Sequence, residues 1–370
     1  MIYIVTFVVA MIFMRKAEKT EHEHGHIKYL ILSGLLLTLL AAFRDITVGH
    51  DVMLYQIRYL EAAKTYGSFI SYMTYYCIPN GIELLYATVT YIAKLLGGTK
   101  TVLFFLNEAI IIFFTYKSLW DYKDDVSPTV SLAYFLFLYY LRGFDQTRQF
   151  MAVAVVLYSF TLFNKQKYLQ SVIFIIMAMG FHSSAIVGFG LLVLFMTTKS
   201  GLRSLYKGLI FISTLVLTMN FSGIFTWVIQ NVSLIPDKYL LIIRQFQGTQ
   251  VNVAGIGFLT YAIAIGILLL IKIFGISEFV NNYDYLVYMM LFSLAGCFVQ
   301  TYAAATARIF AYTDIYSIFV IPLFPKLFRN DDTVNVLIPN LVVYGFGLSS
   351  FVFLFMMRNA GEVYPYVFSL

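Results

Sequence analysis

The sequence predicts an all-α, polytopic integral membrane protein with about 11–14 transmembrane helices and external interfacial helices. Of its 370 residues, 60% are apolar and only 12% are charged, whereas about a quarter of the residues of a soluble domain are charged. Apolar stretches recur along the whole chain, and short polar loops separate them. This composition disfavours a soluble enzyme, a disordered protein, a disulfide-stapled secreted domain and a nucleic-acid binder. The net charge of +6 suits lysine-rich cytoplasmic loops.

The first two spans set the expected orientation. The apolar run Met1–Met14 lacks the positive start and the small-residue cleavage site of a secretory signal. A basic cluster follows, and we expect it to be cytoplasmic: Arg15, Lys16, Lys19 and Lys28. The apolar run Ile27–Phe43 then returns the chain to the external face.

Two segments are predicted to lie outside the membrane. Residues 44–80 are too polar to span it, and they contain an amphipathic pattern typical of an interfacial helix. The apolar positions are Leu54, Ile57, Leu60 and Ala63, and the polar ones are Gln56, Arg58, Glu61 and Lys64. Residues 223–255 are long enough to form a lid or a second interfacial helix.

Further apolar stretches account for the remaining spans. They lie at about 82–96, 101–117, 129–141, 149–163, 168–181, 183–198, 208–222, 256–274, 285–302, 309–325 and 334–357. Several are short, which is tolerated where a helix is buried in protein or lines a cavity. Three lie between residues 80 and 142, whose external ends require an even number of crossings, so one of the three re-enters or lies flat. Without an evident linker or repeat, residues 1–370 are expected to form a single integral membrane domain.

The basic residues divide by side of the membrane. Lysines dominate the loops assigned to the cytoplasm: Lys16, Lys19, Lys28, Lys165, Lys167, Lys199, Lys207 and Lys326. Seven of the ten arginines fall on the external side: Arg44, Arg58, Arg142, Arg148, Arg244, Arg308 and Arg358. Because a guanidinium binds phosphate through two parallel hydrogen bonds, converging arginines would suit a lipid that carries pyrophosphate. The alternative is that each arginine snorkels or pairs with a nearby acid, as Arg44 would with Asp45 and Arg148 with Asp145.

Candidate acid and base groups share the external face. They are Asp45, His50, Asp51, Glu83, Asp145 and His182. Asp51 would orient Arg44 or accept a proton, and Glu83 would cap a helix or act in catalysis. An ordinary histidine pKa of about 6.5 suits His182 to general-base catalysis, with a structural hydrogen-bonding role as the alternative. Tyrosines near this face, among them Tyr55, Tyr75 and Tyr76, would form an interfacial aromatic belt or stack against sugar rings.

No cofactor or metal is expected. The run His22–His26 lies in a short loop and is predicted to be solvated rather than metal-binding. The sequence contains no Gly-rich phosphate loop or GxSxG elbow, and the His22-Glu-His-Gly-His26 run, although it has HExxH spacing, is expected in a loop and not on a helix. These absences disfavour ATP-driven transport and serine or zinc hydrolysis.

Five short motifs, taken in order, resemble the EpsG family of membrane proteins, which belongs with the Wzy-type O-antigen and exopolysaccharide polymerases. They are Phe43-Arg-Asp-Ile-Thr-Val-Gly-His-Asp51 with Tyr55, then Glu83, Arg148-Gln149, Phe181-His-Ser-Ser-Ala185, and Arg308 with Tyr312. The resemblance covers about residues 40 to 325. At His50 the family pattern more often reads Gly-Thr-Asp, so a role for a hydroxyl group does not carry over to this position.

The resemblance implies a glycosyltransferase of lipopolysaccharide biosynthesis in the bacterial inner membrane, with its active site facing the periplasm. It would move a growing glycan from one undecaprenyl pyrophosphate onto a repeat unit carried by another, without a nucleotide sugar, in a GT-C-like fold. The implied partners are undecaprenyl-pyrophosphate-linked oligosaccharides as donor and acceptor, membrane lipids and a chain-length regulator protein.

Charge pattern and resemblance together assign roles to the candidate residues. The pyrophosphate-binding residues are Arg148, Arg308 and Arg142, with Arg44 and Arg244 as further candidates. Asp51, His182 and Glu83 compete for the role of catalytic base, and Tyr55, Gln149 and Tyr312 would contact substrate. The alternatives are a lipid-linked oligosaccharide flippase or other transporter, an O-antigen ligase and a membrane acyltransferase. One-sided charges without a repeat disfavour a transporter, and the motif order argues against a ligase.

Overall fold

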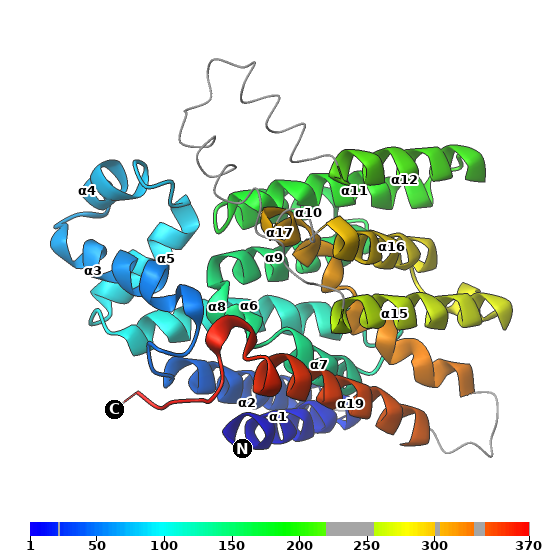
Figure 1. Cartoon of the computed structure of the whole chain (residues 1–370), viewed down its shortest axis with the longest axis horizontal. Helices are drawn as coiled ribbons and strands as arrows, with labels where there is room; N and C mark the ends of the chain where they lie inside the picture. The colour runs from blue at the N-terminus through cyan, green and yellow to red at the C-terminus, as the bar shows by residue number, and fades with distance from the viewer. Residues whose placement is uncertain (21–22, 220–254, 300–303, 329–336, 370) are drawn as a thin grey trace. The chain divides into compact units, whose positions relative to one another are not determined.

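The computed structural model describes residues 1–20, 23–219, 255–299, 304–328 and 337–369. Within these ranges the chain is helical, and its β-pairing is one isolated bridge between Arg44 and Phe368. The chain forms two compact units, residues 1–186 with 322–370, and residues 187–321. Figure 1 traces the order of the helices. That the whole chain acts as a single integral membrane domain stays a prediction.

A helical bundle forms the centre of the first unit. Its members are α1 (Ile2–Lys19), α2 (Glu23–Ala42), α6 (Lys100–Asp121), α7 (Pro128–Leu138), α9 (Thr147–Asn164), α10 (Tyr168–Met179) and α19 (Leu337–Phe351). Helix α2 packs between α1 and α6, α9 packs between α6 and α10, and α7 contacts α1 and α19. Every residue of α7 is buried, which explains why its sequence is apolar all round. Ser127 caps α7 by accepting a hydrogen bond from the Val130 amide, with Pro128 at the first helical position.

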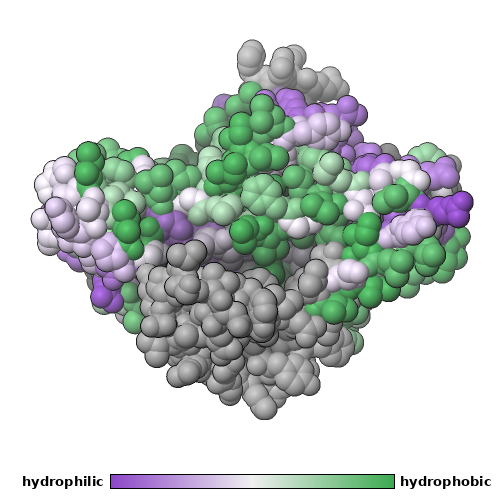
Figure 2. All heavy atoms as spheres, turned by 90° about the horizontal axis from the view of Figure 1, so that it is seen from above, coloured by the Kyte–Doolittle hydropathy of each residue, from purple (hydrophilic) through white to green (hydrophobic). Residues whose placement is uncertain are grey.

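The all-α membrane fold is confirmed. Four helices of the described chain are long and apolar enough to span a bilayer: Gly25–Ala42, Lys100–Asp121, Ile256–Ile273 and Leu337–Met357. Four shorter apolar helices accompany them, at Leu84–Leu95, Pro128–Leu138, Tyr168–Met179 and Ser183–Lys199. Hydrophobic residues cover most of the described surface in Figure 2, as expected for a chain that faces lipid. The total of 11–14 crossings stays a prediction.

A group of short helices leaves the bundle after α2 and returns before α6. They are η1 (Val52–Ile57), α3 (Arg58–Thr65), α4 (Phe69–Tyr72), η2 (Met73–Cys77) and α5 (Leu84–Leu95). We call this group the excursion; α3 packs against α5, and η2 contacts both α4 and α5 (Figure 1). Helix α5 is about 18 Å long at 1.5 Å per residue, too short for a hydrocarbon core of about 30 Å. Helix α7 spans 11 residues and is shorter still, so the number of crossings between residues 80 and 142 stays a prediction.

The amphipathic pattern of residues 44–80 is right in its second half and wrong in its first. Leu60 and Ala63 are buried, as predicted, but Leu54 is 51% exposed and Gln56 is buried. The cause is local: residues 52–57 form a π-helix, whose wider i to i+5 turn rotates the inward face relative to an α-helix. Gln56 donates hydrogen bonds to the Phe144 carbonyl (3.2 Å) and the Thr147 hydroxyl (2.8 Å), so it is a structural residue.

The histidine run also departs from the prediction. Helix α2 begins at Glu23, which places His24 and His26 in its first turn and not in a loop, while His22 lies outside the described residues. The His26 ring stacks on Trp120, with centroids 4.9 Å apart.

Helix α16 (Tyr283–Val299) makes most of the helix contacts within the described part of the second unit. It contacts α15 (Ile256–Ile273), α17 (Ala304–Asp314), α12 (Ser204–Met219) and α11 (Val187–Lys199). At the α16–α17 contact, a Cβ atom on Gly296 would lie 2.5 Å from the Phe310 ring, so only glycine fits there. Three short elements complete this unit, namely η4 (Ile276–Phe279), α18 (Ser317–Val320) and the first residue of η5 (Ile321–Phe328). The predicted external element 223–255 lies almost wholly outside the described residues.

Candidate functional site

An ion pair between Arg148 and Glu83 lies at the centre of the candidate site. Arg148 Nη1 is 2.9 Å from Glu83 Oε2, and the two side chains are 20% and 15% exposed. The other oxygen, Glu83 Oε1, accepts a hydrogen bond from the Ser183 amide at 3.0 Å. One carboxylate therefore joins three segments that the sequence singled out: the start of α5, the start of α9 and the motif at 181–185.

Local structure explains why both side chains are available for this contact. Glu83 occupies the N-cap position of α5 in extended backbone, but its side chain makes no capping hydrogen bond. The capping alternative is therefore wrong. Arg148 is the second residue of α9, an 18-residue helix whose N-terminal dipole favours anions. Arg148 pairs with Glu83 rather than with Asp145, which was the other expected partner.

Three tyrosine rings surround the Arg148 guanidinium. Its Cζ atom lies 5.6 Å from the centroid of Tyr55, 5.5 Å from Tyr59 and 5.7 Å from Tyr86. Tyr59 and Tyr86 are buried, whereas Tyr55 is 37% exposed. The rings attract the cation through their π faces, and the site opens on the Tyr55 side. The structure thus brings Tyr55, Glu83 and Arg148 together.

The loop that carries Asp51 is held from two directions. The Asp51 amide donates to Asp145 Oδ1 at 2.9 Å, and the Gly49 amide donates to the Glu362 carbonyl at 3.0 Å. His50 Nδ1 lies 3.0 Å from Glu362 Oε1, and the hydrogen bond and charge of Glu362 raise the pKa of His50. Asp51 directly precedes η1, so it lies about one turn before Tyr55.

The C-terminal segment is also part of this arrangement, although its sequence carries only a weak sign of such a role. After α19 the chain forms η6 (Val352–Met357) and η7 (Ala360–Glu362) and then runs beside the loop. The Asp45 amide donates to the Val367 carbonyl at 2.8 Å, and the Ser369 amide donates to the Phe43 carbonyl at 2.8 Å. The sequence indicates a role for this C-terminal segment only through a polar cluster that directly follows the last apolar stretch, on the side assigned as external.

His182 faces its own turn. The Ser184 amide donates to His182 Nδ1 at 3.2 Å, and the Ser184 hydroxyl lies 2.7 Å from the same nitrogen. A nitrogen that accepts from an amide carries no proton, so the neutral ring holds its proton on Nε2. In this state His182 is a hydrogen-bond donor at Nε2 rather than a base there. Its neighbour Ser183 provides the amide that binds Glu83.

Arg44 lies in the interior rather than in a phosphate site. Its side chain is 1% exposed, and its Cζ lies 4.1 Å from the Phe104 ring and 4.2 Å from the Phe144 ring. Nη1 donates to the Ala41 carbonyl at 3.0 Å. Asp45, its expected partner, instead contacts Lys100 at 3.2 Å. In this structure Arg44 is enclosed at the junction of α2 and α6 and is not accessible to a lipid.

The remaining candidates are distributed over both units. Arg142, in α8 (Arg142–Asp145), is half-buried and lies 5.2 Å from the Tyr139 ring. Gln149 is a buried residue of α9, and Tyr312 is buried within α17 of the second unit. The backbone of Arg308 lies in α17, and Arg244 lies outside the described residues.

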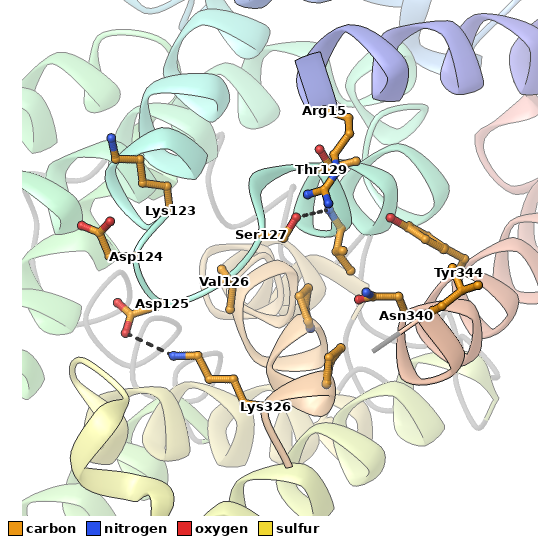
Figure 3. A pocket seen from close by; sticks show the side chains of 14 residues that line it. Arg15, Lys123, Asp124, Asp125, Val126, Ser127, Thr129, Lys326, Asn340 and Tyr344 are labelled. Carbon is orange, nitrogen blue, oxygen red and sulfur yellow. Dashed lines mark hydrogen bonds and ion pairs between the residues drawn. The ribbon is translucent and has the colours of Figure 1, made fainter. Parts of the chain in front are cut away.

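A separate cavity of about 550 Å³ lies at the other end of the first unit (Figure 3). Arg15, Lys123 and Lys326 line it together with Asp124 and Asp125, and Lys326 is 3.9 Å from Asp125. Cations and carboxylates of similar number give the cavity little net preference for an anion. Thr161, near the end of α9, hydrogen-bonds to Asp121 at the end of α6. Because Arg148 begins α9, the cavity and the ion pair lie at opposite ends of the bundle.

A model of the EpsG family matches residues 27–368, a range that contains Tyr55, Glu83, Arg148 and the motif at 181–185. This match confirms the resemblance inferred from the motifs. No curated protein and no solved structure matches the chain, so the GT-C-like relation stays a prediction.

Proposed function

We propose that this chain, which belongs to the EpsG family, is a polysaccharide polymerase. The EpsG family is linked to exopolysaccharide synthesis. The protein would act as a glycosyltransferase that joins repeat units carried on undecaprenyl pyrophosphate. Donor and acceptor are both lipids, so they enter sideways from the bilayer, and a helical site serves them better than a soluble domain. We place the reaction at the periplasmic face of the bacterial inner membrane, because the arginines segregate to the side expected to be external.

The observation that carries this proposal is the state of Arg148. Within the described residues, its one hydrogen bond goes to Glu83 through Nη1, so its other N–H donors remain for a ligand. The guanidinium is held by Glu83 and three rings, yet 20% of the side chain is exposed. A fixed, partly desolvated guanidinium at a helix N-terminus is suited to a phosphate group.

The proposed chemistry assigns Arg148 to the leaving group. A hydroxyl oxygen of the acceptor sugar forms a bond to the anomeric carbon of the donor. The bond from that carbon to the phosphate oxygen breaks, and lipid pyrophosphate leaves with the electron pair. Negative charge therefore grows on phosphate oxygens, and a preorganised arginine stabilises that charge more strongly in the transition state than in the ground state.

The acceptor hydroxyl also needs a base for its proton. Both Glu83 oxygens are already bound, one to Arg148 and one to the Ser183 amide, so we assign Glu83 to positioning. The Nδ1 contacts of His182 favour a donor role at Nε2. Asp51 is our choice for the base, because it directly precedes the helix that carries Tyr55 and its loop is held in place by Asp145. Arg142, Arg308 and Arg244 are further candidates for the second pyrophosphate.

Polysaccharide from complemented deletion strains tests the proposal. We expect Arg148→Ala to abolish polymer while protein remains in the membrane, and Arg148→Lys to restore little, because lysine lacks the bidentate fork. Arg58→Ala is the matched control, since Arg58 is an exposed arginine of the same excursion. A normal polymer ladder from Arg148→Ala at wild-type protein levels would refute the assignment.

The deletion strain itself separates the competing functions. If the glycan is an O-antigen, loss of a polymerase leaves lipid A core with a single repeat unit. Loss of a ligase leaves bare core, and loss of a flippase accumulates lipid-linked units inside the cell. Either of the last two patterns would overturn the polymerase proposal.

A further inference from the structure

A connected series of tyrosine rings leads away from Arg148 through the excursion. The Tyr59 ring, 5.5 Å from the Arg148 guanidinium, lies 6.1 Å from Tyr55 and 6.3 Å from Tyr76. Tyr76 stacks on Tyr72 at 5.8 Å with an interplanar angle of 14°, and Tyr66 lies 5.9 Å from Tyr72 and 6.4 Å from Tyr76. We call these five residues, Tyr55, Tyr59, Tyr66, Tyr72 and Tyr76, the tyrosine row.

The row has a buried layer and an accessible layer. Tyr59 and Tyr72 are buried, and the Tyr72 hydroxyl donates to the Tyr59 carbonyl at 3.2 Å. Tyr55 is exposed, and Tyr66 and Tyr76 are partly exposed. The buried rings therefore hold the accessible rings in fixed positions, which reduces the entropy lost when a ligand binds them.

The accessible rings offer two kinds of contact at once. Within the described residues, the hydroxyls of Tyr55, Tyr66 and Tyr76 form no hydrogen bond to protein. Each ring thus presents an apolar face beside an unused donor and acceptor. A pyranose has the complementary design, with an apolar C–H face and hydroxyl groups around its edge.

The position of the row favours a glycan over lipid headgroups. It begins at the guanidinium that would hold the pyrophosphate and continues into α4 and η2 of the excursion (Figure 1). The sugar residues of a lipid-linked glycan begin directly at the pyrophosphate, so the first of them would lie beside Tyr55. The neighbouring helix α3 carries Arg58, Glu61 and Lys64 on its exposed face, a charged surface that suits water better than acyl chains.

We infer that the tyrosine row is a glycan-binding subsite for the donor, the growing polysaccharide whose pyrophosphate Arg148 holds. This inference rests on the proposed function. A donor of one repeat unit occupies only the start of the row, whereas a longer donor also contacts Tyr76 and Tyr66. The row therefore retains long donors and extends the chain length of the product.

Chain length and direct binding test the inference together. In the complemented deletion strain, we expect Tyr66→Ala and Tyr76→Ala to shift the polymer ladder to shorter modal lengths while the first coupling remains. Tyr168→Ala is the control, because Tyr168 is an exposed tyrosine at the start of α10, outside the row. Tyr76→Phe keeps the stacked ring and should retain long polymer, which also confirms that the position tolerates change.

Binding is measured on the full-length protein in detergent, with oligosaccharides of several repeat units released from the host polysaccharide by mild acid. Each lost ring should weaken binding about 3- to 10-fold, as read by saturation-transfer NMR. The decisive variant combines Tyr66→Ala with Tyr76→Ala. If its binding and its polymer ladder were both unchanged, the glycan-binding role of the tyrosine row would be refuted, while the result for Arg148 would still stand. Loss of all polymer from Arg148→Ala alone supports only the proposed function.

Accessibility separates a glycan surface from a membrane anchor. Both native cysteines, Cys77 and Cys297, are buried, so Tyr76→Cys introduces the one cysteine expected to react. A membrane-impermeant maleimide should label it in intact spheroplasts, and added oligosaccharide should slow the labelling. A residue buried in lipid headgroups would stay unlabelled, and that outcome would refute the subsite.

Discussion

Replacing Glu83 with glutamine tests whether this carboxylate positions Arg148 or takes part in the chemistry. The substitution preserves shape but removes the negative charge that faces a guanidinium at 2.9 Å. An exposed ion pair contributes about 0–1 kcal/mol, and breaking a buried pair costs about 3–5 kcal/mol. The Arg148 and Glu83 side chains are 20% and 15% exposed, so the cost of breaking their pair should lie between these limits. We expect Glu83→Gln to lower the free energy of unfolding by about 1–2 kcal/mol, because glutamine can still accept the Ser183 hydrogen bond.

Polymer synthesis should fall further than stability does. Without its partner, Arg148 loses its fixed position, and misplaced charge stabilisation in a partly desolvated site costs roughly 10- to 100-fold in rate. The assay is transfer between purified lipid-linked repeat units, with thermal unfolding in detergent measured on the same preparations. Glu61→Gln is the control, since Glu61 forms an exposed pair with Lys64 in the same excursion and should change neither quantity by much.

Two results would refute this reasoning. If Glu83→Gln matched Glu61→Gln in stability and rate, the ion pair would have no positioning role. If Glu83→Gln abolished transfer as completely as Arg148→Ala while Glu83→Asp restored it with a changed pH profile, Glu83 would be the base. A double-mutant cycle with Arg148→Gln should show a coupling of about 1 kcal/mol or more if the two side chains act as a unit.

Two further predictions concern the loop that carries Asp51. The pKa of His50 is raised above its ordinary value of 6.5 in the folded protein. The pair with Glu362 therefore stabilises the folded loop fully below pH 6.5, and this stabilisation is lost as the pH rises through the pKa of the folded state. Proteolysis of the loop should therefore speed up modestly from pH 6 to pH 8.5, and Glu362→Gln should flatten that trend; a trend of equal slope in the variant would contradict it. Gly49 has φ of +117°, and a Cβ there would lie 2.9 Å from a backbone carbonyl, so Gly49→Ala should cost about 1–3 kcal/mol in thermal unfolding. Gly67→Ala, with open space around it, should cost far less, and equal losses would contradict the steric argument.

The membrane fold could be predicted because it depends on composition and on the length of apolar runs. These quantities are properties of single segments. The exposed face of residues 52–57 could not be predicted in this way, because a π-helix and an α-helix of the same sequence turn different residues inward. Gln56 is the example: its polarity indicated exposure, but the Phe144 carbonyl and the Thr147 hydroxyl satisfy its amide in the interior.

The candidate site was predicted as a set of residue types, and the structure supplies their pairing. Glu83 and Arg148 are 65 positions apart, and no local pattern relates them. The alternatives considered for each were local ones, a helix cap for Glu83 and Asp145 for Arg148. Both were wrong because tertiary packing brings α5, α9 and residues 181–185 to one point, where the carboxylate finds stronger donors than its own helix offers.

Arg44 and Arg148 show why the segregation of arginines does not by itself identify a phosphate site. Each arginine adjoins an apolar segment on the side assigned as external, and each is surrounded by aromatic rings. Around Arg44 the rings are phenylalanines on two sides at about 4 Å, and 1% of the residue is exposed. Around Arg148 they are tyrosines at more than 5 Å, with one exposed ring and spare N–H donors. A guanidinium enclosed at van der Waals distance has no room for a ligand, whereas one held at a distance by an ion pair leaves room for an anion. Whether such an arginine is an interior residue or can bind an anion therefore depends on how closely aromatic rings from distant parts of the sequence approach its guanidinium.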